Sequence, residues 1–318
     1  MRLTHLIVIM VASSLVAACG GVQIDKKTSL KRELDSMQAS ARTSLQQLSD
    51  GLKAGTVTNA IVLRSYAKAA LSKQPQYRDI IEVLASEGTD NGPTYKALRR
   101  RLEGAENKIL SSLDTQEVAQ SLADEFNNIS TSAQNYDAML VDAINVLADF
   151  TEGELPKMRE LEYADQAAST APVGSEYIGN TNYGEWKQGP TGTSFWAFYG
   201  QYAMFSQLFG RNSMSYGGWN TNRRPSYYHD YGRDAYSSPA GRANQSQADT
   251  RTKKQYTAQG KPFKSSYARS APTIKGATPG TKPAFKSSYA RSGTSSFKSS
   301  SYNSRSSTSG RSSYRGGK

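Results

Sequence analysis

The sequence has 318 residues, a formal net charge of +12 and a single cysteine. One cysteine excludes a disulfide within the chain and a zinc site built on several cysteines. The charge is divided unevenly: residues 1–210 hold 19 Lys and Arg against 24 Asp and Glu (−5), whereas residues 211–318 hold 20 against 3 (+17). The composition therefore predicts a mildly acidic body followed by a strongly basic tail.

The N-terminal residues have the composition of an export signal. Arg2 supplies a positive charge before an apolar run that extends over residues 6–18. This run is shorter than the roughly 20 apolar residues that span a bilayer, and its length is typical of a signal-peptide core. It closes on the sequence Leu15-Val16-Ala17-Ala18-Cys19-Gly20. We therefore expect residues 1–18 to be a signal peptide that is removed on export.

These six closing residues resemble the lipobox of bacterial lipoproteins, in which small residues precede an invariant cysteine. The resemblance implies that Cys19 becomes the N-terminus of the mature chain and carries diacylglycerol, with residues 19–23 as a lipidated N-terminal segment. Each buried methylene contributes about 0.8 kcal/mol, so two or three acyl chains hold a protein on a membrane. In the lipoproteins of Gram-negative bacteria, a residue other than Asp after the cysteine usually accompanies sorting to the outer membrane. Gly20 therefore implies an outer-membrane location. The alternative is an ordinary signal peptide with an unrelated cysteine.

Apolar residues recur at steps of three and four between residues 24 and 155, which is typical of amphipathic helices. Gly55 and the run 88–93 interrupt the pattern, and Asp114 with Glu117 predicts a capped start of a long helix. We predict a mainly α fold, an antiparallel helical bundle over residues 24–155, with coiled-coil pairing between chains as the alternative. The first expected stripe comprises Leu30, Leu34, Met37, Ala41, Leu45, Leu48 and Leu52, and the last comprises Val118, Leu122, Phe126, Ile129, Ala133, Tyr136, Leu140, Ile144 and Leu147.

Two segments of different composition follow the predicted bundle. Residues 156–193 are rich in Ala, Ser, Thr, Gly and Asn, which predicts a linker. Residues 194–210 are uncharged and aromatic, and we predict a helix that packs on the bundle. The alternatives are a helix that lies in the lipid interface, too short to span it, and insertion into a groove of a partner. The side chains expected at a lipid interface are Phe195, Trp196, Phe198, Tyr199, Tyr202 and Phe205.

Residues 211–318 are rich in Ser, Gly, Tyr, Arg and Lys, and they contain no leucine. Such a segment buries too little apolar surface to offset its ordering entropy, which predicts a long disordered basic tail. The sequence Phe-Lys-Ser-Ser-Tyr-Ala-Arg-Ser occurs at residues 263–270 and again at 285–292, with a looser copy at 297–306. Interleaved cations and rings are typical of polyanion binding. The expected contact residues are Lys264, Tyr267, Arg269, Lys286, Tyr289, Arg291, Lys298, Tyr302 and Arg305.

The export signal decides which partners the chain can meet. We expect membrane lipid to bind through the acylated Cys19, and lipopolysaccharide, peptidoglycan or another envelope polyanion to bind the tail, with nucleic acid less favoured. The alternative is a tail that is only a solvated spacer. The last residues, Tyr314-Arg315-Gly316-Gly317-Lys318, are similar to the Tyr-Arg-Lys end of the enteric murein lipoproteins. That resemblance implies a covalent link from Lys318 to peptidoglycan; otherwise the lysine simply ends a basic tail.

No catalytic set is evident, and we predict a chain that is not an enzyme and holds no cofactor or metal. His5 leaves with the signal peptide, and His229 beside Asp230 is interpreted as an accident of composition. We find neither a Gly-rich phosphate loop nor a Gly-x-Ser-x-Gly motif. Carboxylates such as Asp124 and Glu125 are interpreted as solvated helix faces. The favoured function is therefore a structural or interaction role in the envelope; the alternatives are a surface nucleic-acid or polysaccharide binder and a cell-wall enzyme that uses paired carboxylates.

Overall fold

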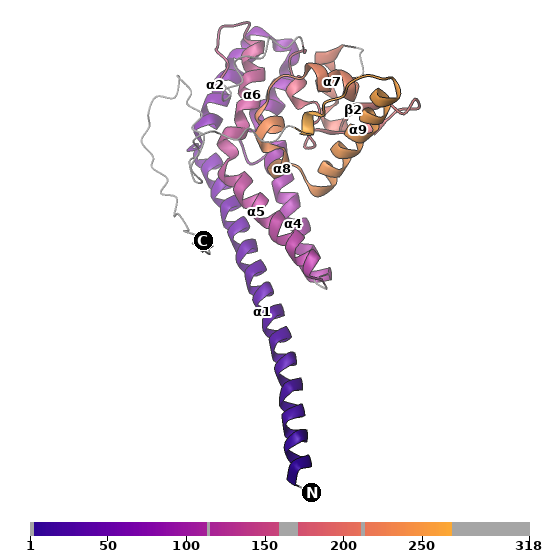
Figure 1. Cartoon of the computed structure of the whole chain (residues 1–318). Helices are drawn as coiled ribbons and strands as arrows, with labels where there is room; N and C mark the ends of the chain where they lie inside the picture. The colour runs from indigo at the N-terminus through magenta and orange to yellow at the C-terminus, as the bar shows by residue number, and fades with distance from the viewer. Residues whose placement is uncertain (1–2, 113–114, 159–170, 211–213, 269–318) are drawn as a thin grey trace, which may run out of the picture.

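The structure is a computed structural model of the whole chain (Figure 1). The structure describes residues 3–112, 115–158, 171–210 and 214–268, of which residues 3–27, 110–112 and 268 by their backbone alone. The chain is mainly helical, as predicted, and its long helices form a bundle. Among the helical residues with described side chains, no stretch is long and apolar enough to cross a membrane.

The first layer of the bundle consists of α1 (Leu3–Ala54), α4 (Pro93–Ser112) and α5 (Gln116–Gln134). In Figure 1, α4 runs in the opposite direction to α1 and α5. Polar contacts align the helices, since the hydroxyls of Ser44 and Ser130 lie 2.9 Å apart. The expected stripe on α1 is confirmed at five of its seven positions, because Leu34, Ala41, Leu45, Leu48 and Leu52 are buried. Leu30 and Met37 are partly buried.

A second layer consists of α2 (Thr58–Lys73), α3 (Arg78–Ser86) and α6 (Tyr136–Phe150), with the short 3₁₀ turn η1 (Pro75–Tyr77) before α3. Gly55, with a φ of 68°, ends α1 and reverses the chain, as its position in the sequence predicted. In this layer α2 packs along α6, and aliphatic side chains fill the space between the helices. The fully buried members include Leu63, Ile81, Leu84, Ile144 and Leu147.

The single long helix predicted after residue 114 is in fact two helices. Asn135, with φ −103° and ψ 14°, separates α5 from α6. A tertiary contact stabilises this break, because Asn59 donates its N–H to Asp137 Oδ1 and its Nδ2 to the Asp137 carbonyl, both at 2.7 Å. The start of α5 also differs by one residue from the prediction: Thr115 is the N-cap, and its hydroxyl accepts from the Val118 N–H at 3.3 Å.

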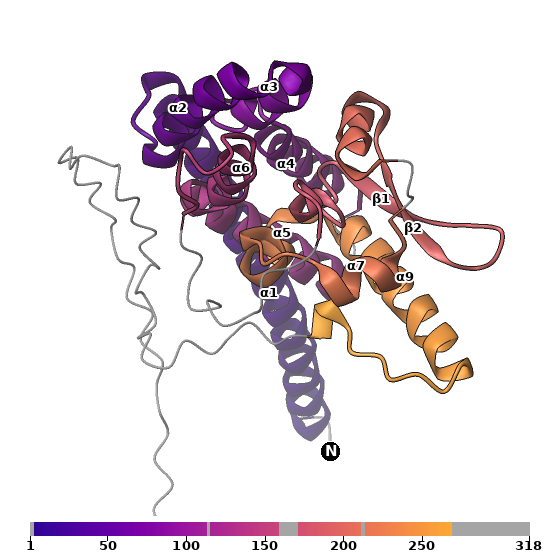
Figure 2. The ribbon, with the colours of Figure 1, turned by 90° about the horizontal axis from the view of Figure 1, so that it is seen from above.

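Residues 171–210 and 214–268 form a C-terminal layer on the bundle. It begins with η2 (Ser175–Tyr177), β1 (Gly184–Gln188), β2 (Ser194–Phe198) and η3 (Gly200–Phe209). The two strands pair antiparallel with Trp186 opposite Trp196. Seen from above, the strands and α9 lie on one side of α5 and α2 lies on the other (Figure 2).

Two predictions for this region are wrong. Residues 171–193 are not a linker, because they contain β1 and buried side chains such as Tyr177 and Tyr183. Residues 194–210 are not one helix, because aromatic residues favour a strand and Pro190 with Gly192 supplies the turn before it. Their packing on the bundle is confirmed by Phe205, which is fully buried.

Contact with a lipid interface is excluded for two of the residues proposed for it. Trp196 and Phe205 are only 6% and 0% exposed, respectively, so their rings are covered by protein. Phe198 stacks on Phe205 with ring centroids 5.6 Å apart, and Phe195 and Tyr202 are partly buried. Tyr199 alone among the six is exposed.

The predicted disorder from residue 211 is wrong for residues 214–268. These residues contain α7 (Tyr216–Asn222), the π-helical turn η4 (Tyr228–Gly232), α8 (Arg233–Tyr236), α9 (Pro239–Ala258) and the 3₁₀ turn η5 (Ser266–Ala268). Large rings supply the apolar area that aliphatic residues would otherwise provide. The fully buried ones are Tyr216, Trp219, Tyr228 and Tyr236. The part of the predicted tail after residue 268 lies outside the described residues.

Candidate functional site

A buried carboxylate connects the bundle to the C-terminal layer. Glu87, 3% exposed, accepts hydrogen bonds from Thr94 Oγ1 at 2.8 Å and Tyr136 Oη at 3.1 Å, both in the bundle. It also accepts from the hydroxyl of Tyr183, which comes from the C-terminal layer. Burial raises the pKa of Glu87, although these donors oppose the shift. Gly92 lies so close that a Cβ there would be 2.7 Å from the Cα of Glu87.

A second buried carboxylate holds the start of η4. Asp142 on α6 accepts from the backbone N–H groups of Tyr227 at 2.6 Å and Tyr228 at 2.9 Å. Burial raises the pKa of Asp142 to about 7, against the effect of these two donors. Nearby, Arg224 Nη1 lies 2.5 Å from Asp149 Oδ2, so an ion pair reinforces the same junction. The C-terminal layer is therefore attached to α6 through the carboxyl groups of Asp142 and Asp149.

The pair His229 and Asp230, interpreted from sequence as accidental, has a structural position. Asp230 forms a buried ion pair with Arg223. His229 is 7% exposed, its Nε2 lies 3.2 Å from the Glu176 carbonyl, and its ring meets Trp219 edge-on at 5.0 Å. Burial and the neighbouring Arg223 lower the pKa of His229 to about 3. The imidazole is therefore neutral at physiological pH and serves in packing.

An aromatic cluster forms the centre of the C-terminal layer. We define it as Trp186 of β1, Trp196 of β2, and Tyr216 and Trp219 of α7. Trp186 lies at the middle, with ring centroids 5.2 Å from Trp196, 4.9 Å from Tyr216 and 5.4 Å from Trp219. Asn244 of α9 holds β1 beside it through two hydrogen bonds to the Trp186 backbone. These edge-to-face contacts give the cluster a fixed shape.

The first copy of the tail repeat packs on this cluster. The Tyr267 ring centroid lies 5.8 Å from both Tyr216 and Trp219, and Trp186 Nε1 donates to Tyr267 Oη at 3.3 Å. Lys264 remains exposed. Tyr267 was predicted to stack on a polyanion, and the structure instead places its ring against the protein.

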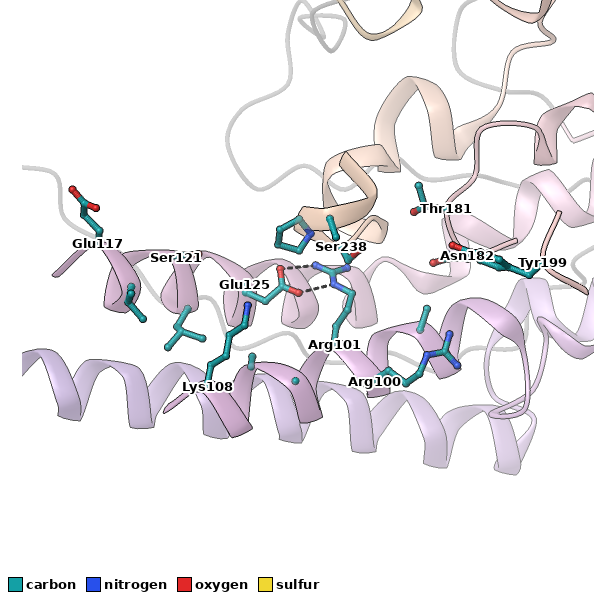
Figure 3. A pocket seen from close by; sticks show the side chains of 17 residues that line it. Arg100, Arg101, Lys108, Glu117, Ser121, Glu125, Thr181, Asn182, Tyr199 and Ser238 are labelled. Carbon is teal, nitrogen blue, oxygen red and sulfur yellow. Dashed lines mark hydrogen bonds and ion pairs between the residues drawn. The ribbon is translucent and has the colours of Figure 1, made fainter. Parts of the chain in front are cut away.

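A cleft of about 930 Å³ separates α4 and α5 from the C-terminal layer (Figure 3). Across its floor, Arg101 and Glu125 form a bidentate ion pair, with Nε–Oε1 2.7 Å and Nη2–Oε2 2.9 Å. Arg101 also donates to the Ala235 carbonyl of α8 at 2.5 Å. Glu125 is thus buried in an ion pair, which corrects the prediction that it lies on a solvated face.

The walls of the cleft carry cations and an exposed ring. Arg100 and Lys108 lie two turns apart on α4, and both are exposed. Gly104, between them, has open space where a side chain would project. On the other side lie Asn182 and Tyr199, of which Tyr199 is 40% exposed. Such a cleft can bind an anionic group through its cations and a sugar ring or other flat face through the tyrosine.

Several predicted site residues are not placed by the structure. Cys19 lies in the part of α1 that is described by its backbone alone. The tail residues that lie outside the described residues are Arg269, Lys286, Tyr289, Arg291, Lys298, Tyr302, Arg305 and Lys318. Sequence reasoning missed the cleft residues Arg100 and Lys108, whose spacing of eight residues along α4 was the available signal.

The Arg101–Glu125 pair provides a stability prediction. Arg101→Met leaves the Glu125 carboxylate buried and unpaired, and we expect the free energy of unfolding to fall by about 3–5 kcal/mol. Adding Glu125→Leu removes the uncompensated charge and should restore most of that loss. Urea titration measures both variants. Arg99→Met is the matched control, because the Arg99–Glu103 pair is 58% exposed on both sides and should contribute less than about 1 kcal/mol. Equal losses for Arg101→Met and Arg99→Met would contradict the assignment.

His229 provides a prediction of pH dependence. Its pKa is about 3 in the folded chain, against roughly 6.5 in an unfolded one. Between these values only the unfolded chain binds the proton, so stability is lost as the pH falls from about 6.5 towards 3, by at most about 1.4 kcal/mol per pH unit. His229→Gln should flatten this slope when urea titrations are repeated from neutral to acidic pH. Slopes that do not differ between the two chains would refute the prediction.

Comparison with known proteins gives no relative for the chain. No family model matches it, and neither a curated protein nor a solved structure shows significant similarity. Its chemistry is therefore inferred from its own residues.

Proposed function

We propose that this chain is a lipid-anchored protein of the bacterial envelope with a structural or interaction role. In this proposal, Cys19 carries the lipid, the helical body is a rigid support, and the basic C-terminal residues contact an envelope polyanion. The observation that carries the proposal is the packing of residues 263–268 on the aromatic cluster. The chain is fixed to the body at that point, with the Tyr267 ring turned inward and Lys264 exposed.

The shape of α1 supports a tether. The helix continues from Leu3 to Ala54, and its buried stripe begins at Leu34. In Figure 1 the N-terminal part of α1 projects well beyond the other helices. Leu34 lies 15 positions after Cys19, which corresponds to about 22 Å of helix at 1.5 Å per residue. A lipid at Cys19 would therefore hold the body at this distance from the membrane surface.

The charge of the remaining sequence supports contact with a polyanion. Residues 269–318 contain no Asp or Glu. Lys and Arg attract phosphate and carboxylate groups and release their counterions. Lipopolysaccharide, anionic lipid and peptidoglycan carry such groups in the envelope. The cations of this segment are Arg269, Lys275, Lys282, Lys286, Arg291, Lys298, Arg305, Arg311, Arg315 and Lys318.

The cleft offers a second point of contact for the same partner. Arg100 and Lys108 can bind phosphate or carboxylate, and the exposed Tyr199 ring can stack on a sugar. This combination favours a polymer with both sugars and anionic groups. We therefore propose peptidoglycan or lipopolysaccharide ahead of nucleic acid.

Two variants separate the anchor from the polyanion site. The Cys19→Ser variant should lose acyl labelling and leave the membrane fraction. Its affinity for lipopolysaccharide or peptidoglycan should equal that of the native chain. A chain that ends at Ala268 should remain acylated and membrane-bound but lose most salt-sensitive binding. With 6–10 charge contacts, affinity should fall by roughly 10³–10⁵ between 50 and 200 mM salt, by analogy with phosphate contacts.

Each half of the proposal can fail by itself. A native chain without acyl label would contradict the anchor, whatever it binds. Binding that is unchanged by the truncation would contradict a role of the tail. In that case the double variant Arg100→Ala/Lys108→Ala tests the cleft, with Arg99→Ala, exposed on the same helix outside the cleft, as its control. Binding to neither polymer would leave the tail as a spacer.

A further inference from the structure

Residues 263–268 contact the body in the way that a short bound peptide would. The Phe263 ring lies against Tyr256 of α9, with centroids 5.4 Å apart, and 6.5 Å from Tyr216. Four residues further along, the Tyr267 ring lies on Tyr216 and Trp219. Two rings at a fixed spacing are thus held by the aromatic cluster and α9.

A backbone clamp lies between the two rings. Asn220 of α7 donates from Nδ2 to the Lys264 carbonyl at 2.8 Å and accepts the Ser266 N–H at Oδ1, at 2.6 Å. Ser266 is 6% exposed, and its hydroxyl lies 3.4 Å from the Asn220 carbonyl. The clamp therefore requires a small residue at the Ser266 position. It binds the backbone on either side of Ser265, at the Lys264 carbonyl and the Ser266 N–H.

The contacts around the Tyr267 side chain are specific for a tyrosine ring. Its hydroxyl accepts from Trp186 Nε1, and the Arg233 guanidinium carbon lies 4.7 Å from the ring centroid. Beneath it, Gly179 has a φ of +84°, and a Cβ at Gly179 would lie 3.3 Å from the Tyr267 hydroxyl. The backbone of the C-terminal layer therefore approaches the hydroxyl closely.

The same recognition residues occur once more in the chain at the same spacing. Residues 285–292 are identical to residues 263–270 at all eight positions, so Phe285, Ser288 and Tyr289 correspond to Phe263, Ser266 and Tyr267. The looser copy differs where the contacts are made. Its tyrosine, Tyr302, stands five residues after Phe297 instead of four. The second copy can therefore make every contact of the first, whereas the third cannot place both rings.

We propose that the aromatic cluster, with Asn220 and Tyr256, is a binding site for the peptide Phe-Lys-Ser-Ser-Tyr-Ala, and that residues 285–292 of the same chain are its alternative occupant. The inference does not depend on the lipid anchor or on a polyanion. When the second copy binds, residues 263–284 become a loop that contains Arg269, Lys275 and Lys282. The exchange would change how much of the basic tail extends from the body.

Chain entropy explains why the first copy occupies the site. After α9 ends at Ala258, 4 residues precede Phe263 and 26 precede Phe285. Closing the longer loop lowers the occupancy on the order of 15-fold, by the three-halves power of loop length. A second molecule competes still less well at micromolar concentration, because a short flexible connection corresponds to an effective concentration of about millimolar. Loss of the first copy should therefore favour the second copy of the same chain.

Tryptophan fluorescence can test the exchange, because all 3 tryptophans of the chain belong to the aromatic cluster. Tyr267→Ala should keep an emission maximum and an acrylamide quenching constant close to those of the native chain. Tyr289→Ala and Tyr302→Ala should change neither. Tyr267→Ala/Tyr289→Ala should shift the emission to the red and raise the quenching constant. A synthetic peptide of residues 285–292 should reverse that change, and a peptide of residues 297–304 should not.

Hydrogen exchange provides a second measurement that does not need the double variant. The segment 285–290 should exchange more slowly in Tyr267→Ala than in the native chain, with the Ser288 amide in the clamp, at any protein concentration. The proposal would be overturned if the tryptophans of Tyr267→Ala were quenched as strongly as those of the double variant and the amides of segment 285–290 showed no protection from exchange. Protection that appears only together with concentration-dependent dimers would overturn the assignment to the same chain.

Discussion

The buried carboxylates of Glu87 and Asp142 connect two parts of the chain that the sequence separates by composition. Glu87 binds hydroxyls from both layers at once, and Asp142 binds two N–H groups at the start of η4. A buried acceptor that loses its donors costs about 1–3 kcal/mol, and more when it is charged. The bundle therefore depends on the C-terminal layer to satisfy its polar interior. The position of β1, α7 and the aromatic cluster follows from this attachment.

The helices of the bundle could be predicted because their signal is local. Leu34, Leu45, Leu122 and Ile144 belong to the predicted apolar stripes and are buried as expected. The break at Asn135 was not predictable in the same way, because it is stabilised by Asn59, 76 residues earlier in the chain. The C-terminal layer was missed because its core is built from isolated rings between Gly and Ser. Ser238 followed by Pro239 was the clearest overlooked signal, since it is the N-cap and first residue of α9.

The candidate sites show a similar division. A ring beside a cation has the same sequence pattern whether it binds a ligand or the protein itself. Tyr267 was therefore assigned to a polyanion, although it contacts Trp219 and Arg233. The cleft was not predicted because its two sides come from residues far apart in the chain, such as Arg100 and Tyr199. Only the fold brings them together, and Figure 3 shows them on facing walls.

Because Glu87 and Asp142 bind donors of the C-terminal layer, the bundle and this layer should unfold as one cooperative unit. The chain allows this to be measured directly, because all three tryptophans lie in the C-terminal layer while most long helices lie in the bundle. Urea unfolding should be followed by tryptophan fluorescence and by far-ultraviolet circular dichroism on the same samples. We predict that the two transitions coincide in midpoint and slope. A fluorescence transition at clearly lower urea, with the helical signal retained, would show a separately folding layer and contradict the account.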